Sequence, residues 1–161
     1  MEDETHFKQL GELHFLDLFK DDGNKSIVDQ LKVINIFPSY VQEEEVGIFL
    51  SEITLSEVEE ALKGFKKDKS PGPDGWSVEF FLWFFNLVGL ELLRVVEQSR
   101  IEGEVINSIN ATFITLIPTC EKPLTFADFR PISLYNLIYK LISKIAAIRL
   151  KPFLEKAISA Q

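Results

Sequence analysis

The sequence predicts an α+β fold that is mostly helical and contains one β-hairpin. Apolar residues recur at helical spacing over most of the chain. A run rich in β-branched and aromatic side chains, residues 111–117, instead has the composition of a β-strand. Prolines and glycines interrupt the helical pattern most sharply between residues 70 and 75. With 46% hydrophobic residues, the chain has enough apolar material for a packed core.

The front of the chain predicts one helix and one short apolar segment. Residues 5–20 carry apolar side chains at helical spacing, and Asp21-Asp22-Gly23 ends this pattern. A second apolar segment covers residues 29–37. We assign residues 1–50 to an acidic linker with an N-terminal helical segment.

Two further helices are expected before the hairpin. Thr54 and Glu57 fit a capping box, in which each side chain accepts a backbone N–H of the other residue, and this helix should end near Lys66. A longer helix should run from Ser77 to about Ser99. It is apolar on all sides between Phe80 and Phe85, so we expect it to be buried.

The hairpin and a final helix complete the prediction. Residues 111–117 form the first strand and residues 129–133 the returning strand. Pro131 has no N–H to donate, so its strand should lie at an edge or turn that position outward. The last helix should run from Leu134 to about Leu150, where Pro152 then stops or kinks it.

The charge of the chain is unevenly distributed. The formal net charge is −8, which is unusual for a nucleic-acid-binding protein. However, residues 1–60 hold 15 acidic and 4 basic side chains, whereas residues 61–161 hold 10 acidic and 13 basic ones. The second part of the chain can therefore meet phosphate groups.

Cysteine content and hydropathy indicate the cellular compartment. A single cysteine, Cys120, excludes an internal disulfide framework. The opening residues lack the basic flank and apolar run of a signal peptide. The most apolar stretch, from Phe80 to Leu90, is too short to cross a bilayer. We expect a soluble intracellular protein that is not secreted and has no membrane partner.

No catalytic or metal-binding residues are predicted. The histidines, His6 and His14, both lie in the acidic front segment, and we expect them to be surface or packing residues. The sequence has no Cys/His cluster with zinc-ligand spacing and no phosphate-binding loop of the Gly-x₄-Gly-Lys-Ser/Thr type. Asp17, Asp21 and Asp22 lack the alternating ligand order of a calcium loop.

The most distinctive string lies between the second and third expected helices. There a structural loop stiffened by two prolines consists of Pro71, Gly72, Pro73, Asp74 and Gly75. We expect Gly72 and Gly75 to supply positive φ where the turn requires it. From composition alone, the alternative interpretation is a simple connector between two helices, with its lysines exposed to solvent.

Several ordered motifs resemble the start of the reverse transcriptase domain of non-LTR (LINE-type) retrotransposons, especially those of plants. Lys69-Ser70-Pro71-Gly72-Pro73-Asp74-Gly75 with the following aromatic helix resembles the family's opening signature. Residues 112–118 and 128–134 resemble its first two strands, and residues 136–144 and 149–152 resemble the helix that follows. The resemblance implies that residues 51–161 are the fingers part of a right-hand polymerase, an incomplete domain truncated before the palm.

The resemblance also implies a nucleotide-binding role for the hairpin. In this family the arginine of the Arg-Pro-Ile-Ser motif, here Arg130, contacts the triphosphate of the deoxynucleotide. The family's first strand usually ends in Ile-Pro-Lys, whereas here Thr119 replaces the lysine, and Lys122 could partly supply the missing charge. The alternative for Arg130 is a structural ion pair with a carboxylate such as that of Asp128.

The resemblance further implies an RNA template or an RNA–DNA hybrid as partner. The basic residues expected to contact it are Lys66, Lys67, Lys69, Lys140 and Lys144. The full-length family enzyme uses Mg²⁺ held by palm aspartates, which lie beyond the position of Gln161, so we expect no cofactor and no polymerase activity in this chain alone. The nucleus is the location that the resemblance suggests.

A second interpretation is an interaction module without catalysis. The aromatic helix at Phe80–Phe85 would then dock a protein partner instead of being buried in its own domain.

Overall fold

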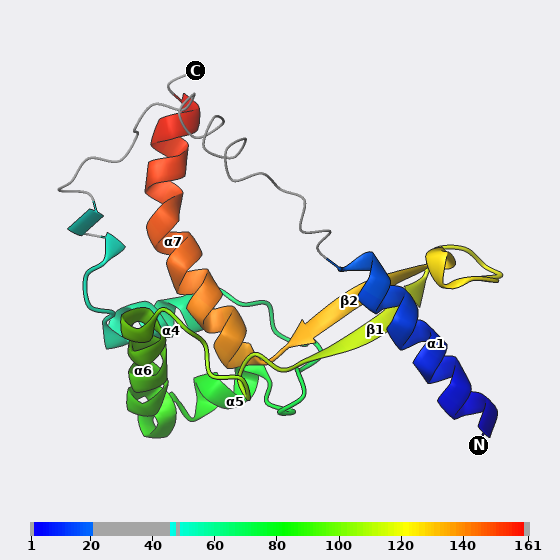
Figure 1. Ribbon diagram of the computed structural model, residues 1–161. Coiled ribbons are helices and arrows are strands. Elements are labelled where there is room, and N and C mark those ends of the chain that lie inside the picture. Colours follow the sequence, from blue (N-terminus) through cyan, green and yellow to red (C-terminus); the bar gives the residue numbers. More distant parts are fainter. Residues whose placement is uncertain (1, 21–45, 48, 160–161) are drawn as a thin grey trace. The chain divides into compact units, whose positions relative to one another are not determined.

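The computed structural model describes residues 2–20, 46–47 and 49–159 (Figure 1). The contacts divide the chain into two compact units. The smaller unit consists of residues 1–39 and 116–131, and the larger unit of residues 40–115 and 132–161. The apolar segment expected at residues 29–37 lies outside the described residues.

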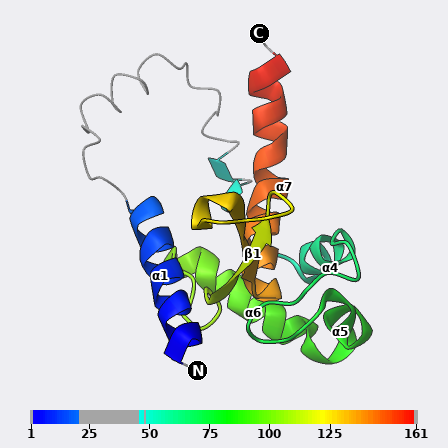
Figure 2. The ribbon, with the colours of Figure 1, turned by 90° about the vertical axis from the view of Figure 1, so that its right-hand side faces the viewer.

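The larger unit is a bundle of helices α4 (Leu55–Lys63), α5 (Val78–Trp83), α6 (Phe85–Glu102) and α7 (Leu137–Ser159). Helices α4 and α6 are central, because each contacts the other three. Figure 2 shows α4, α5 and α6 gathered beside the first turns of α7. The core consists of Val58, Ala61, Leu62, Val78, Phe81, Leu92, Val96, Leu137, Leu141 and Ile145. Amphipathic periodicity therefore assembles this unit.

The predicted capping box of α4 is confirmed. The Oγ1 of Thr54 accepts a hydrogen bond from the Glu57 amide at 3.2 Å, and Oε2 of Glu57 accepts one from the Thr54 amide at 2.9 Å. Arg149 of α7 also donates to both carboxylate oxygens of Glu57, at 2.9 and 3.0 Å. The start of α4 is thereby tied to the middle of α7.

The same arginine holds the segment that leads into α4. Its Nη1 donates to the carbonyl oxygens of Phe49 and Ser51, and its Nη2 donates to that of Glu52. The Arg149 side chain is only 11% exposed, so these partners compensate for the loss of water around the guanidinium group.

The single long helix expected from Ser77 to Ser99 is wrong. The chain leaves helical geometry at Phe84 (φ −103°, ψ 16°), which separates α5 from α6. The expected complete burial is wrong as well, because Phe81 belongs to the core whereas Trp83 is 79% exposed. In one straight helix only one side of this apolar run could pack against the neighbouring helices. The break at Phe84 lets α5 and α6 each bury their own apolar side.

The predicted hairpin is confirmed as an antiparallel pair of strands, β1 (Thr112–Pro118) and β2 (Phe129–Tyr135), with a short 3₁₀ helix, η1 (Phe126–Asp128), between them. The α+β fold class is therefore correct. The returning strand is longer than expected and contains Leu134, which the apolar periodicity predicts to start the last helix. An apolar residue at this position fits both the helical and the strand periodicity. Leu134 belongs to the strand because this segment pairs with β1.

Helix α7 begins at Leu137 and continues to Ser159, so of the two expected outcomes at Pro152, a stop or a kink, the stop is wrong. Proline removes one backbone hydrogen bond, but helical turns on both sides keep the helix intact. The ion pair between Lys151 and Glu155, at 3.5 Å, spans the proline. Across the residues that the model describes, no helix is both long and apolar enough to cross a membrane.

The smaller unit is built around one phenylalanine. Helix α1 (Glu2–Leu18) places Phe7 and His14 against the ring of Phe126, with ring centroids 5.1 and 5.6 Å apart. Gly11 is buried beneath this ring, where an added Cβ would lie 3.1 Å from it. His14 is thus a packing residue, as its position in the sequence suggested.

Replacing Glu57 by Gln should lower the free energy of unfolding by about 1–2 kcal/mol at neutral pH. The hydrogen bond from Arg149 is the main cause that holds the pKa of Glu57 below its usual value of 4.5. A lowered carboxylate pKa adds stability above pH 4.5, and this contribution is lost as the pH falls through the lower folded-state value.

Chemical denaturation at a series of pH values measures both effects. Glu59→Gln is the control, since Glu59 lies on the same helix in an exposed pair with Lys63 and should matter by less than about 0.5 kcal/mol. Equal losses in the two variants, or an unchanged pH dependence in Glu57→Gln, would contradict a structural role for the Arg149 pair.

Candidate nucleic-acid interface

The loop between α4 and α5 is a defined turn. The Gly75 amide donates to the Gly72 carbonyl oxygen at 3.1 Å, and the Trp76 amide donates to Oδ1 of Asp74 at 3.1 Å. Gly75 has φ 75°, so the expectation of positive φ is confirmed there. Two hydrogen bonds and the positive φ of Gly75 therefore define this turn.

Asn136 holds this turn in place. Its side chain is 4% exposed, and Oδ1 accepts a hydrogen bond from the Asp74 amide at 3.1 Å. Its Nδ2 donates to the carbonyl oxygens of Ser108 and Ile109, at 3.1 and 3.3 Å. One buried amide thus connects the loop, the segment before β1 and the junction between β2 and α7.

Gly72 is required by close packing and not by its φ angle. The expected positive φ at Gly72 is wrong, since among the described glycines it occurs at Gly75 and Gly103. Instead, a Cβ on Gly72 would lie 2.4–2.6 Å from backbone atoms of Tyr135 and Asn136. No side chain fits this space, so glycine lets the loop rest directly on the β2–α7 junction.

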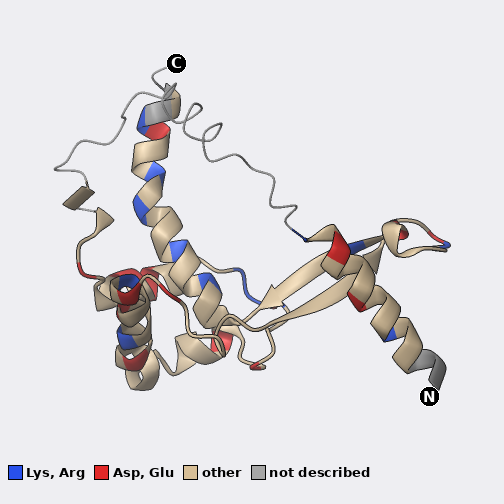
Figure 3. Ribbon diagram, in the orientation of Figure 1, with Lys and Arg blue, Asp and Glu red and all other residues tan. Residues whose placement is uncertain are grey.

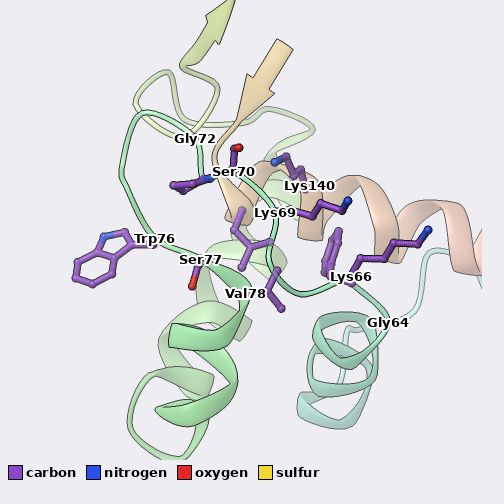
Figure 4. A pocket seen from close by; sticks show the side chains of 12 residues that line it. Gly64, Lys66, Lys69, Ser70, Gly72, Trp76, Ser77, Val78 and Lys140 are labelled. Atoms are coloured by element: carbon purple, nitrogen blue, oxygen red, sulfur yellow. The ribbon is translucent and has the colours of Figure 1, made fainter. Parts of the chain in front are cut away.

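Beside this loop lies a pocket of about 360 Å³ (Figure 4). Lys66 and Lys69 of the loop and Lys140 of α7 line it, and Figure 4 shows their side chains extending on the same side of the loop. Val78 and Leu137, both almost completely buried, contribute its apolar floor. The fold therefore brings together basic side chains that lie far apart in the sequence.

The lysines of the pocket have no counter-ion within the described part of the chain. No ion pair or hydrogen bond involves the side chain of Lys66, Lys69 or Lys140 there. The nearby carboxylate of Glu79 accepts a hydrogen bond from the Asp68 amide at 2.8 Å, which is the main cause that lowers its pKa. Figure 3 shows the basic residues of the loop beside the first turns of α7.

The other two predicted lysines lie outside the pocket lining. Lys67 is exposed on the same loop, and its charge is one of the influences that lower the pKa of Glu79. Lys144 of α7 places Nζ 4.2 Å from the centroid of the Phe65 ring, a cation–π contact. Both nevertheless belong to the same unit as the pocket.

Arg130 and Lys122 belong to the smaller unit and are exposed. The expected alternative, an ion pair between Arg130 and Asp128, is absent from the residues described. The Asp128 carboxylate instead accepts hydrogen bonds from the amides of Thr125 and Leu124, at 2.9 and 3.0 Å, and these bonds lower its pKa. The guanidinium group of Arg130 is thus not engaged by its neighbouring carboxylate.

Thr119 has a structural role in the hairpin. Its amide and its hydroxyl group both donate to the carbonyl oxygen of Asp128, each at 2.8 Å. These bonds close the hairpin, because they join the residue after β1 to the last residue of η1, directly before β2. Thr119 therefore contributes a contact that closes the hairpin.

Metal-binding geometry is not found in the described residues: no three His, Cys, Asp or Glu side chains there are grouped so that they could hold a metal ion. Sequence reasoning missed Asn136 as an organising residue. The only signal available was its position between a strand and a helix, where a polar residue often bonds to nearby backbone.

No family model matches this chain. The chain is 34% identical over 106 residues to the transposon TX1 uncharacterized 149 kDa protein of Xenopus laevis. The matched region is 66% of this chain but 8% of the frog protein, so the chain spans a small part of that protein's length. Part of this chain is therefore similar to part of a transposon protein.

Replacing Gly72 by Ala should cost about 2–3 kcal/mol of stability, because backbone atoms of Tyr135 and Asn136 cannot move aside as a flexible side chain would. Thermal or chemical unfolding measures the change. Gly47→Ala is the matched control: nothing lies within 4 Å of its added Cβ, so stability should change by less than about 0.5 kcal/mol. A harmless Gly72→Ala would show that the loop does not rest on the junction.

Proposed function

We propose that residues 51–161 are the fingers part of the reverse transcriptase domain of a plant-type non-LTR (LINE-type) retrotransposon. The similarity to a transposon protein, the antiparallel hairpin and the ordered loop support this proposal. In the parent enzyme this part would help to hold the RNA template and the incoming deoxynucleoside triphosphate during DNA synthesis.

The main support for the proposal is that Arg130 is exposed and has no partner among the described residues. It is exposed on β2, and within the described residues its guanidinium group has no ion pair or hydrogen bond. A planar guanidinium group can make two parallel hydrogen bonds to phosphate oxygens and stays charged at any physiological pH. Lys122, in the same unit, adds a second positive charge for the triphosphate.

The larger unit supplies the proposed contacts to the RNA backbone. Lys66, Lys69 and Lys140 surround one pocket, and Lys67 and Lys144 lie on the same loop and helix. Binding should be weak and should fall steeply with salt, because each phosphate contact releases counter-ions. The excess acidic charge of the sequence belongs to residues 1–60, and none of the residues that line the pocket is acidic.

The described residues do not fit the Mg²⁺ ions that the parent enzyme uses. No three carboxylate, cysteine or histidine side chains come together among them, and two-metal polymerisation needs a carboxylate cluster. The role that we propose for the described residues is therefore binding of RNA and of the triphosphate.

One observation favours a second candidate function, a module that docks a protein partner. Trp83 at the end of α5 and Leu87 on α6 are 79% and 78% exposed, and Phe84 between them is also exposed. Exposed apolar patches of this kind commonly mark interaction sites. In this function the exposed apolar residues would contact the protein partner, and the lysines around the pocket would have no role in binding.

The proposed function predicts that Arg130→Ala weakens binding of a deoxynucleoside triphosphate at least about tenfold, because a paired, charge-assisted contact is lost. The affinity of Arg130→Lys should lie between those of the unchanged chain and Arg130→Ala, because lysine keeps the positive charge but cannot make two parallel hydrogen bonds. Equilibrium titration with a fluorescent deoxynucleoside triphosphate measures these affinities.

Arg94→Ala is the control for net charge, because Arg94 is exposed on α6 and pairs with Glu91. It should leave the affinity unchanged. Equal affinities for Arg130→Ala and the unchanged chain would rule out the triphosphate role of the hairpin and would favour the docking module.

A further inference from the structure

We propose that the pocket beside the Pro71–Gly75 loop seats one unpaired nucleotide of a single-stranded RNA, with its base on the apolar floor and its phosphate at the lysine rim. This inference rests on the proposed function and deepens it, since it assigns a particular ligand to one pocket of the proposed interface. It involves neither Arg130 nor the hairpin.

The size and floor of the pocket suit a base. Its volume of about 360 Å³ lies within the usual range for pockets that take small organic ligands. Phe65, Val78 and Leu137 present apolar surface there. Val78 and Leu137 keep 7% and 5% of their surface exposed, so the floor is the outer face of the hydrophobic core. A flat base could cover this surface and exclude water from it.

The rim suits a phosphate group. The side chains of Lys66, Lys69 and Lys140 come from two segments and extend on one side of the loop (Figure 4). None of the residues that line the pocket is acidic. An inorganic phosphate would use the rim alone, and an apolar peptide side chain would use the floor alone. A nucleotide carries both chemical groups within one unit.

The lysines around the pocket favour a strand over a free nucleotide. Lys67 and Lys144 lie on the same loop and helix but outside the pocket lining, so positive charge continues past the rim. A strand brings neighbouring phosphates to these positions, whereas a mononucleotide does not. A duplex keeps its bases stacked and paired, so they cannot reach a pocket of this kind.

The pocket is formed without a ligand. The bond from the Asp74 amide to Asn136 and the direct packing of Gly72 on the β2–α7 junction fix the loop that forms one wall. Helix α7, which carries Lys140 and Leu137, starts at the same junction. Binding therefore needs little reorganisation of the protein, which favours affinity.

The test compares strands of equal length and charge on the full chain at low salt. An end-labelled RNA of about ten nucleotides should bind about tenfold more tightly than a strand of the same length built from abasic sites, because only the intact strand offers a base to the floor. The same RNA annealed into a duplex should lose this advantage. Adenosine monophosphate should bind far more weakly than the strand.

Lys69→Gln and Lys67→Gln form a matched pair, since both lysines are exposed on one loop but only Lys69 lines the pocket. Lys69→Gln should reduce the preference for the intact strand, whereas Lys67→Gln should weaken both strands equally. Circular dichroism should be unchanged in both.

Equal affinity for the intact and abasic strands would overturn the pocket inference and leave the proposed function standing. Adenosine monophosphate that binds as tightly as the strand would overturn the assignment to a single strand. Loss of binding to every strand at low salt would contradict the proposed RNA contacts themselves, and triphosphate binding by Arg130 tests the hairpin role separately.

Discussion

Asn136 lies buried where β2 ends and α7 begins, and its side-chain amide bonds to three backbone groups in two other segments. A buried amide that lost these partners would be costly, so the loop and the segment before β1 must meet at this point. Gly72 makes the meeting sterically possible by leaving room for the backbone of Tyr135 and Asn136. The arrangement of the lysine pocket depends on this junction.

Arg149 provides a corresponding constraint further along α7. Its guanidinium group bonds to Glu57 and to three carbonyl oxygens of residues 49–52, so α7 is fixed against the start of α4. Lys140 and Lys144 lie between Asn136 and Arg149 on this helix. The bonds of Asn136 and Arg149 therefore fix the part of α7 that carries Lys140 and Lys144. Burial of the hydrophobic core supplies most of the stability.

The sequence was sufficient for features that local chemistry determines. The Thr54–Glu57 capping box, the β-branched strand at residues 112–118 and the positive φ of Gly75 follow from the neighbouring residues themselves. Features set by tertiary contacts could not be predicted. The break at Phe84, the roles of Asn136 and Gly72, and the bonds of Arg149 depend on residues up to 100 positions away. Of the predicted site, the lysines around one pocket are brought together, whereas the placement of Arg130 in a nucleotide site remains a prediction.

The Asn136 junction holds the Pro71–Gly75 loop in the conformation that the proposed RNA contacts require, before any nucleic acid arrives. Amide hydrogen exchange at Asp74 and Gly75 tests it most directly, because both amides donate hydrogen bonds within this arrangement. We expect both amides to be protected in the free chain and to gain little protection when single-stranded RNA is added. Rapid exchange in the free chain, with protection only after RNA binds, would show that the ligand orders the loop and would contradict the claim.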